Sequence, residues 1–172
     1  MSDNDTPWTL LASRVVRVVL ARQDTGYTQL LDSLTLLGVK ETERSLASRV
    51  SRGRIKASVF LQILVATDAR VPERWRSAMT LPGTWDDRVK GIVIAELARH
   101  PLVSMEDAAQ RMIRIGAELS EKTLTAHLIE GTLSLPELLQ FLVVMASDSL
   151  EYYIDYHVLV AAAQTYSTCV LN

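Results

Sequence analysis

The chain contains two similar segments, and this internal repeat restricts its possible folds more than any other feature of its 172 residues. Residues 8–22 align with residues 85–99, and residues 38–65 align with residues 116–143 after one inserted residue. Identical pairs include Gly38/Gly116, Glu43/Glu121, Leu46/Leu124, Gly53/Gly131, Leu61/Leu139, Gln62/Gln140 and Leu64/Leu142. Two copies are too few for a solenoid, so the repeat predicts a tandem pair of small domains.

Each copy is predicted to form four helices, because its apolar residues recur at helical spacing and no stretch alternates with a period of two. Thr28 and Thr42 are expected to cap the second and third helices, and Gly53 is expected to end the third. In the second copy, Pro136 suits the first turn of a helix. The fold class is therefore all-α, with a further helix expected over residues 150–166.

Charge is divided unevenly between the copies. Residues 8–79 carry 12 basic and 6 acidic side chains, whereas residues 80–172 carry 6 basic and 12 acidic ones, within a net charge of -2. Such asymmetry indicates nucleic-acid contact by the basic half. The alternative is two solvated surfaces of opposite sign that attract each other.

The basic residues of the first copy concentrate around its predicted third helix. One predicted helical stripe opposite Leu46 and Val50 has the polar side chains needed to reach base edges, and the following loop has the cations needed to contact phosphate. The candidate DNA-binding residues are Arg44, Ser45, Ser48, Arg49, Arg52, Arg54 and Lys56. The second copy has Lys122, Thr123, Ala126, His127, Glu130, Thr132 and Ser134 at these positions. It is therefore expected to be a poor DNA reader.

Short helices, a Gly-Val turn and the ending "RVSRG" (49–53) resemble the helix-turn-helix of the Cro and phage-repressor type, although Ser51 replaces a typical glutamate and the spacing from Gly38 to Gly53 is longer. A closer resemblance is to a bacterial family of domains of unknown function, with the pattern "GV-x-E-T-E-x-x-L", "SRG" and "F-L-x-x-L" over residues 8–75. The second copy departs from it with "IEG" (129–131). These resemblances imply two tandem helix-turn-helix-like domains, a basic one at 8–79 and a degenerate acidic one at 80–172.

Enzymatic, metal-dependent and membrane functions have little support in the sequence. His100, His127 and His157 are not spaced as metal ligands, Cys169 is the single cysteine, and no Gly-rich phosphate loop is present. No enzyme activity and no cofactor are therefore expected. No apolar run reaches the roughly 18 residues of a membrane span, and no signal peptide is recognised, so a cytoplasmic location is expected.

The C-terminal segment is amphipathic and rich in tyrosine, which is common in protein interfaces. It predicts a homodimer interface at Leu150, Tyr152, Ile154, Tyr156 and Val158, although packing of this segment on its own repeat is an alternative. The function expected overall is that of a bacterial or phage transcriptional regulator binding double-stranded DNA through the first copy. The acidic second half would dimerise or bind a protein partner. The alternative is a protein-interaction adaptor in which neither copy touches DNA.

Overall fold

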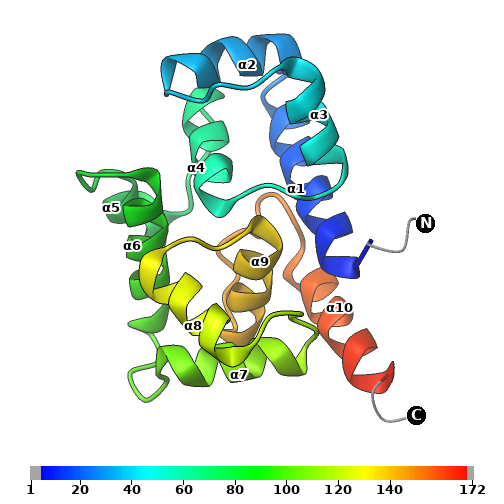
Figure 1. Ribbon diagram of the computed structural model, residues 1–172, viewed down its shortest axis with the longest axis vertical. Helices are drawn as coiled ribbons and strands as arrows, with labels where there is room; N and C mark the ends of the chain where they lie inside the picture. The colour runs from blue at the N-terminus through cyan, green and yellow to red at the C-terminus, as the bar shows by residue number, and fades with distance from the viewer. Residues whose placement is uncertain (1–4, 170–172) are drawn as a thin grey trace.

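The computed structural model describes residues 5–169 and is helical throughout (Figure 1). The first copy forms four helices, α1 (Pro7–Arg22), α2 (Tyr27–Leu36), α3 (Glu43–Ser51) and α4 (Ala57–Ala66). A connection with the short helices η1 (Glu73–Trp75) and α5 (Arg76–Met79) leads to the second copy. That copy forms α6 (Trp85–Leu97), α7 (Met105–Arg114), α8 (Glu121–Glu130) and α9 (Leu135–Val144), followed by α10 (Tyr156–Cys169). The all-α prediction is confirmed.

Most local signals act as expected, and one prediction is wrong. The Thr42 hydroxyl accepts a hydrogen bond from the Ser45 amide and caps α3, and Pro136 lies in the first turn of α9. Thr28 does not cap α2, because the helix already begins at Tyr27 and its N-cap is Gly26. A threonine inside the first turn cannot occupy the extended N-cap position.

The C-terminal helix is shorter than predicted. Residues 150–155 form turns, and α10 begins only at Tyr156. Leu150 and Ile154 lie in these turns with exposed fractions of 1% and 3%, so they belong to the interior of the chain. The helical stripe predicted from Leu150 onward is therefore wrong, because both apolar side chains turn into the core before the helix starts.

The two copies pack crosswise. Helix α1 of the first copy packs against α9, the fourth helix of the second, and α6 correspondingly packs against α4. One continuous hydrophobic cluster runs through both copies and includes Phe60 and Leu138, which are equivalent in the repeat. Each copy therefore completes the core of the other, and the chain folds as one interlocked unit.

Equivalent residues meet where the copies join. The Ala57 amide donates to the Leu133 carbonyl at 2.9 Å, and the Leu135 amide donates to the Ile55 carbonyl at 2.7 Å. These bonds form an antiparallel bridge between Lys56 and Ser134, which align with each other in the repeat. An isologous contact of this kind is the mark of a two-fold axis, here a pseudo-axis within one chain.

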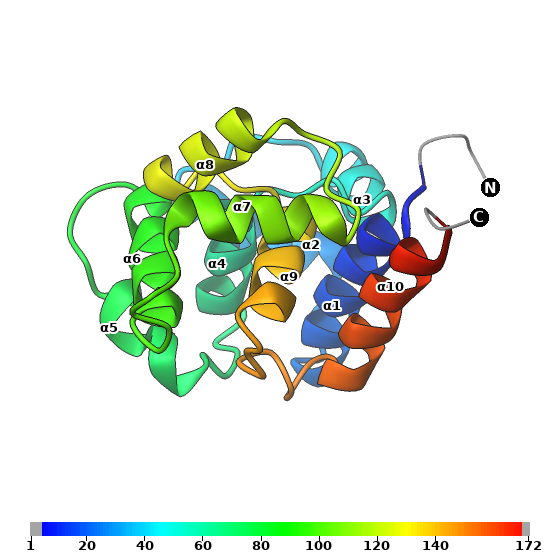
Figure 2. The ribbon, with the colours of Figure 1, turned by 90° about the horizontal axis from the view of Figure 1, so that it is seen from below.

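A half turn about the line of sight in Figure 1 brings α1 near α6, α2 near α7, α3 near α8 and α4 near α9. Because the axis lies along the line of sight, the two third helices, α3 and α8, lie on the same side of the molecule. Figure 2 shows both of them along its upper edge, with the segments that follow α4 and α9 along the lower edge.

Candidate nucleic-acid interface

Helix α3 presents a polar face to solvent. Leu46 and Val50 are fully buried and fix the orientation of the helix. Arg44 and Ser45 are consequently exposed, and Ser48 is half-buried. The predicted division of α3 into an apolar inner face and a polar outer face is thus present in the structure.

Arg49 is held by its own copy rather than left free. Its Nη1 donates to both carboxylate oxygens of Glu41, each at 3.0 Å, and its Nε donates to the Arg54 carbonyl at 3.4 Å. The Glu41 side chain is only 9% exposed, against 36% for Arg49. While this pair is intact, the guanidinium is committed to positioning the loop after α3 and is not available to a base edge.

The loop after α3 is fixed by a glycine. Gly53 has φ +63, and a Cβ there would overlap the carbonyl oxygen of Thr9 in α1. A residue with a side chain would have to push the loop away from α1, so glycine keeps the two backbones in contact. This contact places Arg52, Arg54 and Lys56 outside the core, with all three exposed.

Three of these cations lack an internal partner. Within residues 5–166, the side chains of Arg44, Arg52 and Lys56 make no ion pair or hydrogen bond with another group of the chain. None of them is buried against the acidic second copy. Lys56 also lies at the pseudo-two-fold axis, beside Ser134. The exposed cations therefore extend from α3 to the middle of the face that α3 shares with α8.

The same surface of the second copy has a different chemistry. His127 occupies the position of Arg49, and its Nδ1 lies 3.2 Å from Oε1 of Glu137. The exposed residues there include Lys122 and Glu130. The position equivalent to Arg49 is thus tethered to a carboxylate in both copies, but the surrounding surface of the second copy carries little positive charge.

The residues predicted for a dimer interface do not form one exposed stripe. Leu150 and Ile154 are buried in the single chain and cannot contact a second chain while the protein stays folded. Tyr156 and Val158 are half-buried, and Tyr152 is 44% exposed. A single stripe would need one continuous helix through these positions, whereas the helix begins only at Tyr156.

The remaining titratable candidates are dispersed. His100 Nε2 lies 2.7 Å from the Met145 carbonyl, and His157 is exposed. Within the described residues, no group of three or more potential ligands could hold a metal ion. None of the helices in the described residues combines the length and the hydrophobicity of a membrane-spanning segment. The side chain of Cys169 lies outside the described residues.

These features define a class of protein, an all-helical tandem repeat whose two copies interlock about an internal pseudo-two-fold axis. The chain belongs to the family described as Domain of unknown function (DUF6471), whose model matches residues 8–71 and again residues 85–150. The prediction of two copies of such a family is thereby confirmed. No curated protein and no solved structure matches the chain.

Proposed function

We propose that the chain binds double-stranded DNA through the first copy and acts as a transcriptional regulator. The observation that carries this proposal is a group of exposed cations beside the polar face of α3 that find no partner among residues 5–166, namely Arg44, Arg52 and Lys56. Arginine and lysine side chains placed in this way are suited to phosphate oxygens. Arg44, Ser45 and Ser48 are then the side chains proposed to reach base edges.

The internal axis places the third helices of the two copies on one side of a single chain. Helix-turn-helix proteins usually gain affinity by pairing two reading heads on one side of a duplex. Here one chain already carries α3 and α8 on one side (Figure 2). Because the surface around α8 carries little positive charge, a second reading head would come from a second chain. A homodimer would have to use surfaces other than Leu150 and Ile154.

The turn between α2 and α3 limits the analogy with repressors. It spans residues 37–42, longer than the roughly three or four residues usual in a helix-turn-helix. Helix α3 is therefore expected to enter a groove at an angle different from that of a repressor's recognition helix.

The test uses the full chain, a labelled duplex and a range of salt concentrations. Arg52→Ala and Lys56→Ala should each lower the slope of log K against log salt by about 0.9, the value for one lost phosphate contact. Arg99→Ala is the matched control, since it removes an exposed arginine from the second copy. Equal losses in all three variants, or no binding at low salt, would remove the basis of the proposal.

The variant Arg49→Ala shows whether Arg49 positions the loop after α3 or contacts DNA itself. Removing Arg49 takes away the ion-pair partner of the nearly buried Glu41, which then keeps only the hydrogen bond from the Ser45 hydroxyl. Such a loss typically costs about 1–3 kcal/mol. We expect Arg49→Ala to lower the melting temperature, whereas Arg52→Ala leaves it unchanged. If Arg49→Ala weakens binding to one preferred site at full stability, Arg49 reads a base as the sequence suggested.

The adaptor remains the second candidate. It is favoured by two apolar side chains away from α3 that are almost fully exposed, Leu36 at 88% and Leu102 at 95%. An adaptor would retain its partner after Arg52→Ala and lose it after Leu36→Ser or Leu102→Ser. Cross-linking in lysates of the source cells, compared between these variants, tests this alternative.

A further inference from the structure

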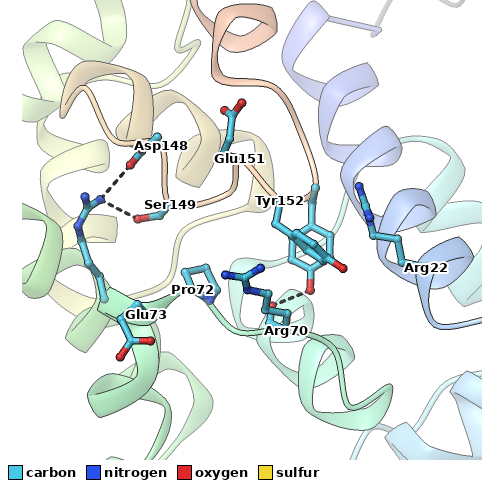
Figure 3. A pocket seen from close by; sticks show the side chains of 10 residues that line it. Arg22, Arg70, Pro72, Glu73, Asp148, Ser149, Glu151 and Tyr152 are labelled. Carbon is cyan, nitrogen blue, oxygen red and sulfur yellow. Dashed lines mark hydrogen bonds and ion pairs between the residues drawn. The ribbon is translucent and has the colours of Figure 1, made fainter.

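A pocket of about 640 Å³ opens where the two copies meet, at the opposite end of the pseudo-axis from α3 and α8. One wall is the segment that follows α4, with Arg70 and Arg74, and the other is the segment that follows α9, with Asp148 and Tyr152. The end of α1 adds Arg22 (Figure 3). Both copies are needed to build this pocket.

The contacts across the pocket follow the repeat. Arg70 and Asp148 occupy equivalent positions, and so do Arg74 and Tyr152. The Arg74 guanidinium lies 3.4 Å from Asp148 Oδ1, and the Arg70 guanidinium carbon lies 5.0 Å from the centre of the Tyr152 ring. The pseudo-two-fold axis relates these two contacts to each other. The contact between Arg74 and Asp148 is an ion pair, and the contact between Arg70 and Tyr152 is a cation–π contact.

Two guanidinium groups in this pocket lack a counterion. Arg22 and Arg70 both lie over the Tyr152 ring, at 4.3 Å and 5.0 Å from its centre, and Figure 3 shows the ring between them. Within residues 5–166 neither forms an ion pair with a carboxylate. Two like charges close to one ring repel each other, so an anion at the exposed edge of the ring, close to both guanidinium groups, would be stabilised.

The carboxylates that line the pocket are already engaged. Asp148 pairs with Arg74, and Glu73 pairs with Arg76 at 3.0 Å. Glu151 accepts a hydrogen bond from the backbone amide of Tyr156 at 2.7 Å. Glu151 keeps its negative charge while it accepts this bond, but none of these acids forms an ion pair with Arg22 or Arg70, and both guanidinium groups remain able to bind a ligand.

Hydrogen bonds within the chain hold the backbone at Arg70 and the side chain of Arg74 in the pocket walls. The Tyr153 hydroxyl donates to the Arg70 carbonyl at 2.6 Å and fixes the backbone that carries the Arg70 side chain. Burial raises the pKa of Tyr153, which keeps this hydroxyl protonated and able to donate. Arg74 is anchored by Ser147 and Ser149, at 3.3 Å and 3.2 Å. The walls of the pocket are thus held before any ligand arrives.

We propose that this pocket binds a small molecule that carries a diphosphate group, with one phosphate on Arg22 and the other on Arg70 around the exposed edge of the Tyr152 ring. Each guanidinium can donate two parallel hydrogen bonds to a phosphate, and a doubly charged phosphate matches two cations better than one carboxylate does. The exposed part of Tyr152 offers a surface for the rest of the ligand. This site is independent of the DNA proposal.

The test is calorimetric titration of the full chain with inorganic pyrophosphate. Wild-type protein should bind it, and Arg22→Ala or Arg70→Ala should weaken binding by about tenfold or more, roughly 1.4 kcal/mol. Arg88→Ala is the matched control, because Arg88 lies over the Trp85 ring at 4.1 Å but outside the pocket. Melting curves of each variant verify that it is folded, and Arg22→Lys provides a second, milder change.

Four results would overturn the proposal. Wild-type protein that binds no pyrophosphate at millimolar concentration has no such site, and an Arg88→Ala loss equal to that of Arg22→Ala makes the binding non-specific. Citrate that binds as tightly as pyrophosphate rules out phosphate selectivity. Duplex DNA that displaces pyrophosphate would make the pocket part of the DNA surface, whereas simultaneous binding of both ligands supports a separate site.

Discussion

The two copies share a backbone and differ in their outer chemistry. Gly53 and Gly131 each bring a loop against the first helix of its own copy, at Thr9 and at the equivalent Asp86. One residue before these glycines, the exposed position is Arg52 in one copy and Glu130 in the other. Packing positions are thus matched, whereas outward positions are free to carry opposite charges.

The comparison extends to the join between the copies. The crossed pairs Arg70–Tyr152 and Arg74–Asp148 need one copy of each kind. A pairing of two identical first copies would bring four arginines together at the axis and would be unfavourable. The difference between the copies therefore favours pairing within the chain over pairing between first copies of two chains.

The largest effect is expected from the matched glycines. Gly53→Ala and Gly131→Ala should each destabilise the protein by about 3 kcal/mol or more, because the new Cβ overlaps backbone and the φ of +63 or +74 disfavours side chains. Gly38→Ala is the control, since Gly38 has φ +88 but open space around it. It should cost only about 1 kcal/mol. Urea unfolding measures all three, and equal losses would show that conformation alone matters.

A charge change at Glu130 sharpens the contrast between the copies. Glu130→Arg gives the second copy the arginine that Arg52 supplies in the first, at an exposed position where stability should not change. If α8 faces the same duplex as α3, DNA affinity should rise several-fold at low salt, and the salt dependence should steepen by about 0.9. Unchanged binding by the full-length variant would indicate that DNA lies only along the first copy.

A smaller difference lies in the helix caps. The N-terminus of α1 is capped by the neutral pair Thr6 and Thr9, whereas that of α6 is capped by Thr84 and Asp87. Hydrogen bonds from the Thr84 backbone and side chain lower the pKa of Asp87 below its ordinary value of 3.8. Stability from this cap is therefore present above that value and is lost as the pH falls through the lowered pKa.

The pH dependence of the two helix caps is tested by comparing the variants Asp87→Asn and Thr9→Ala. Asp87→Asn should remove part of the loss of stability below about pH 4, and Thr9→Ala should lower stability by the same amount at pH 3 and pH 7. Urea unfolding at both pH values measures the difference. A Thr9→Ala effect that depends on pH as strongly as that of Asp87→Asn would contradict this assignment.

The sequence predicts the helices and the repeat because these depend on local spacing. The positions of Leu46, Val50 and Gly53 are read correctly from periodicity and turn chemistry. The crosswise packing of α1 on α9 cannot be predicted from the sequence. An apolar face shows that a helix packs against another element, but it does not show which element that is. Leu150 and Ile154 are misassigned because a helix was expected to run through them, whereas they lie in turns that point into the core.

The sequence predicts which residues belong to the candidate site but not which of them contact each other. All seven candidate DNA-binding residues lie where the third helix and its loop were expected, yet Arg49 is tied to Glu41, eight residues earlier. The pair of Arg22 and Arg70 over Tyr152 has no signal in the sequence. Arg22, Arg70 and Tyr152 come from three segments that are distant in the sequence, and only the packing of the two copies brings them together.

The backbone bridge at Lys56 and Ser134 also makes the amides of Ala57 and Leu135 reporters of a single event. Both amides are hydrogen-bonded across the join, so their exchange with deuterated solvent requires the copies to separate at that point. If separation exposes the shared core, these amides exchange only through global unfolding and at the slowest rate in the chain. Faster exchange of these two amides than of the amides in α4 and α9 would mean that the two copies separate locally while each remains helical.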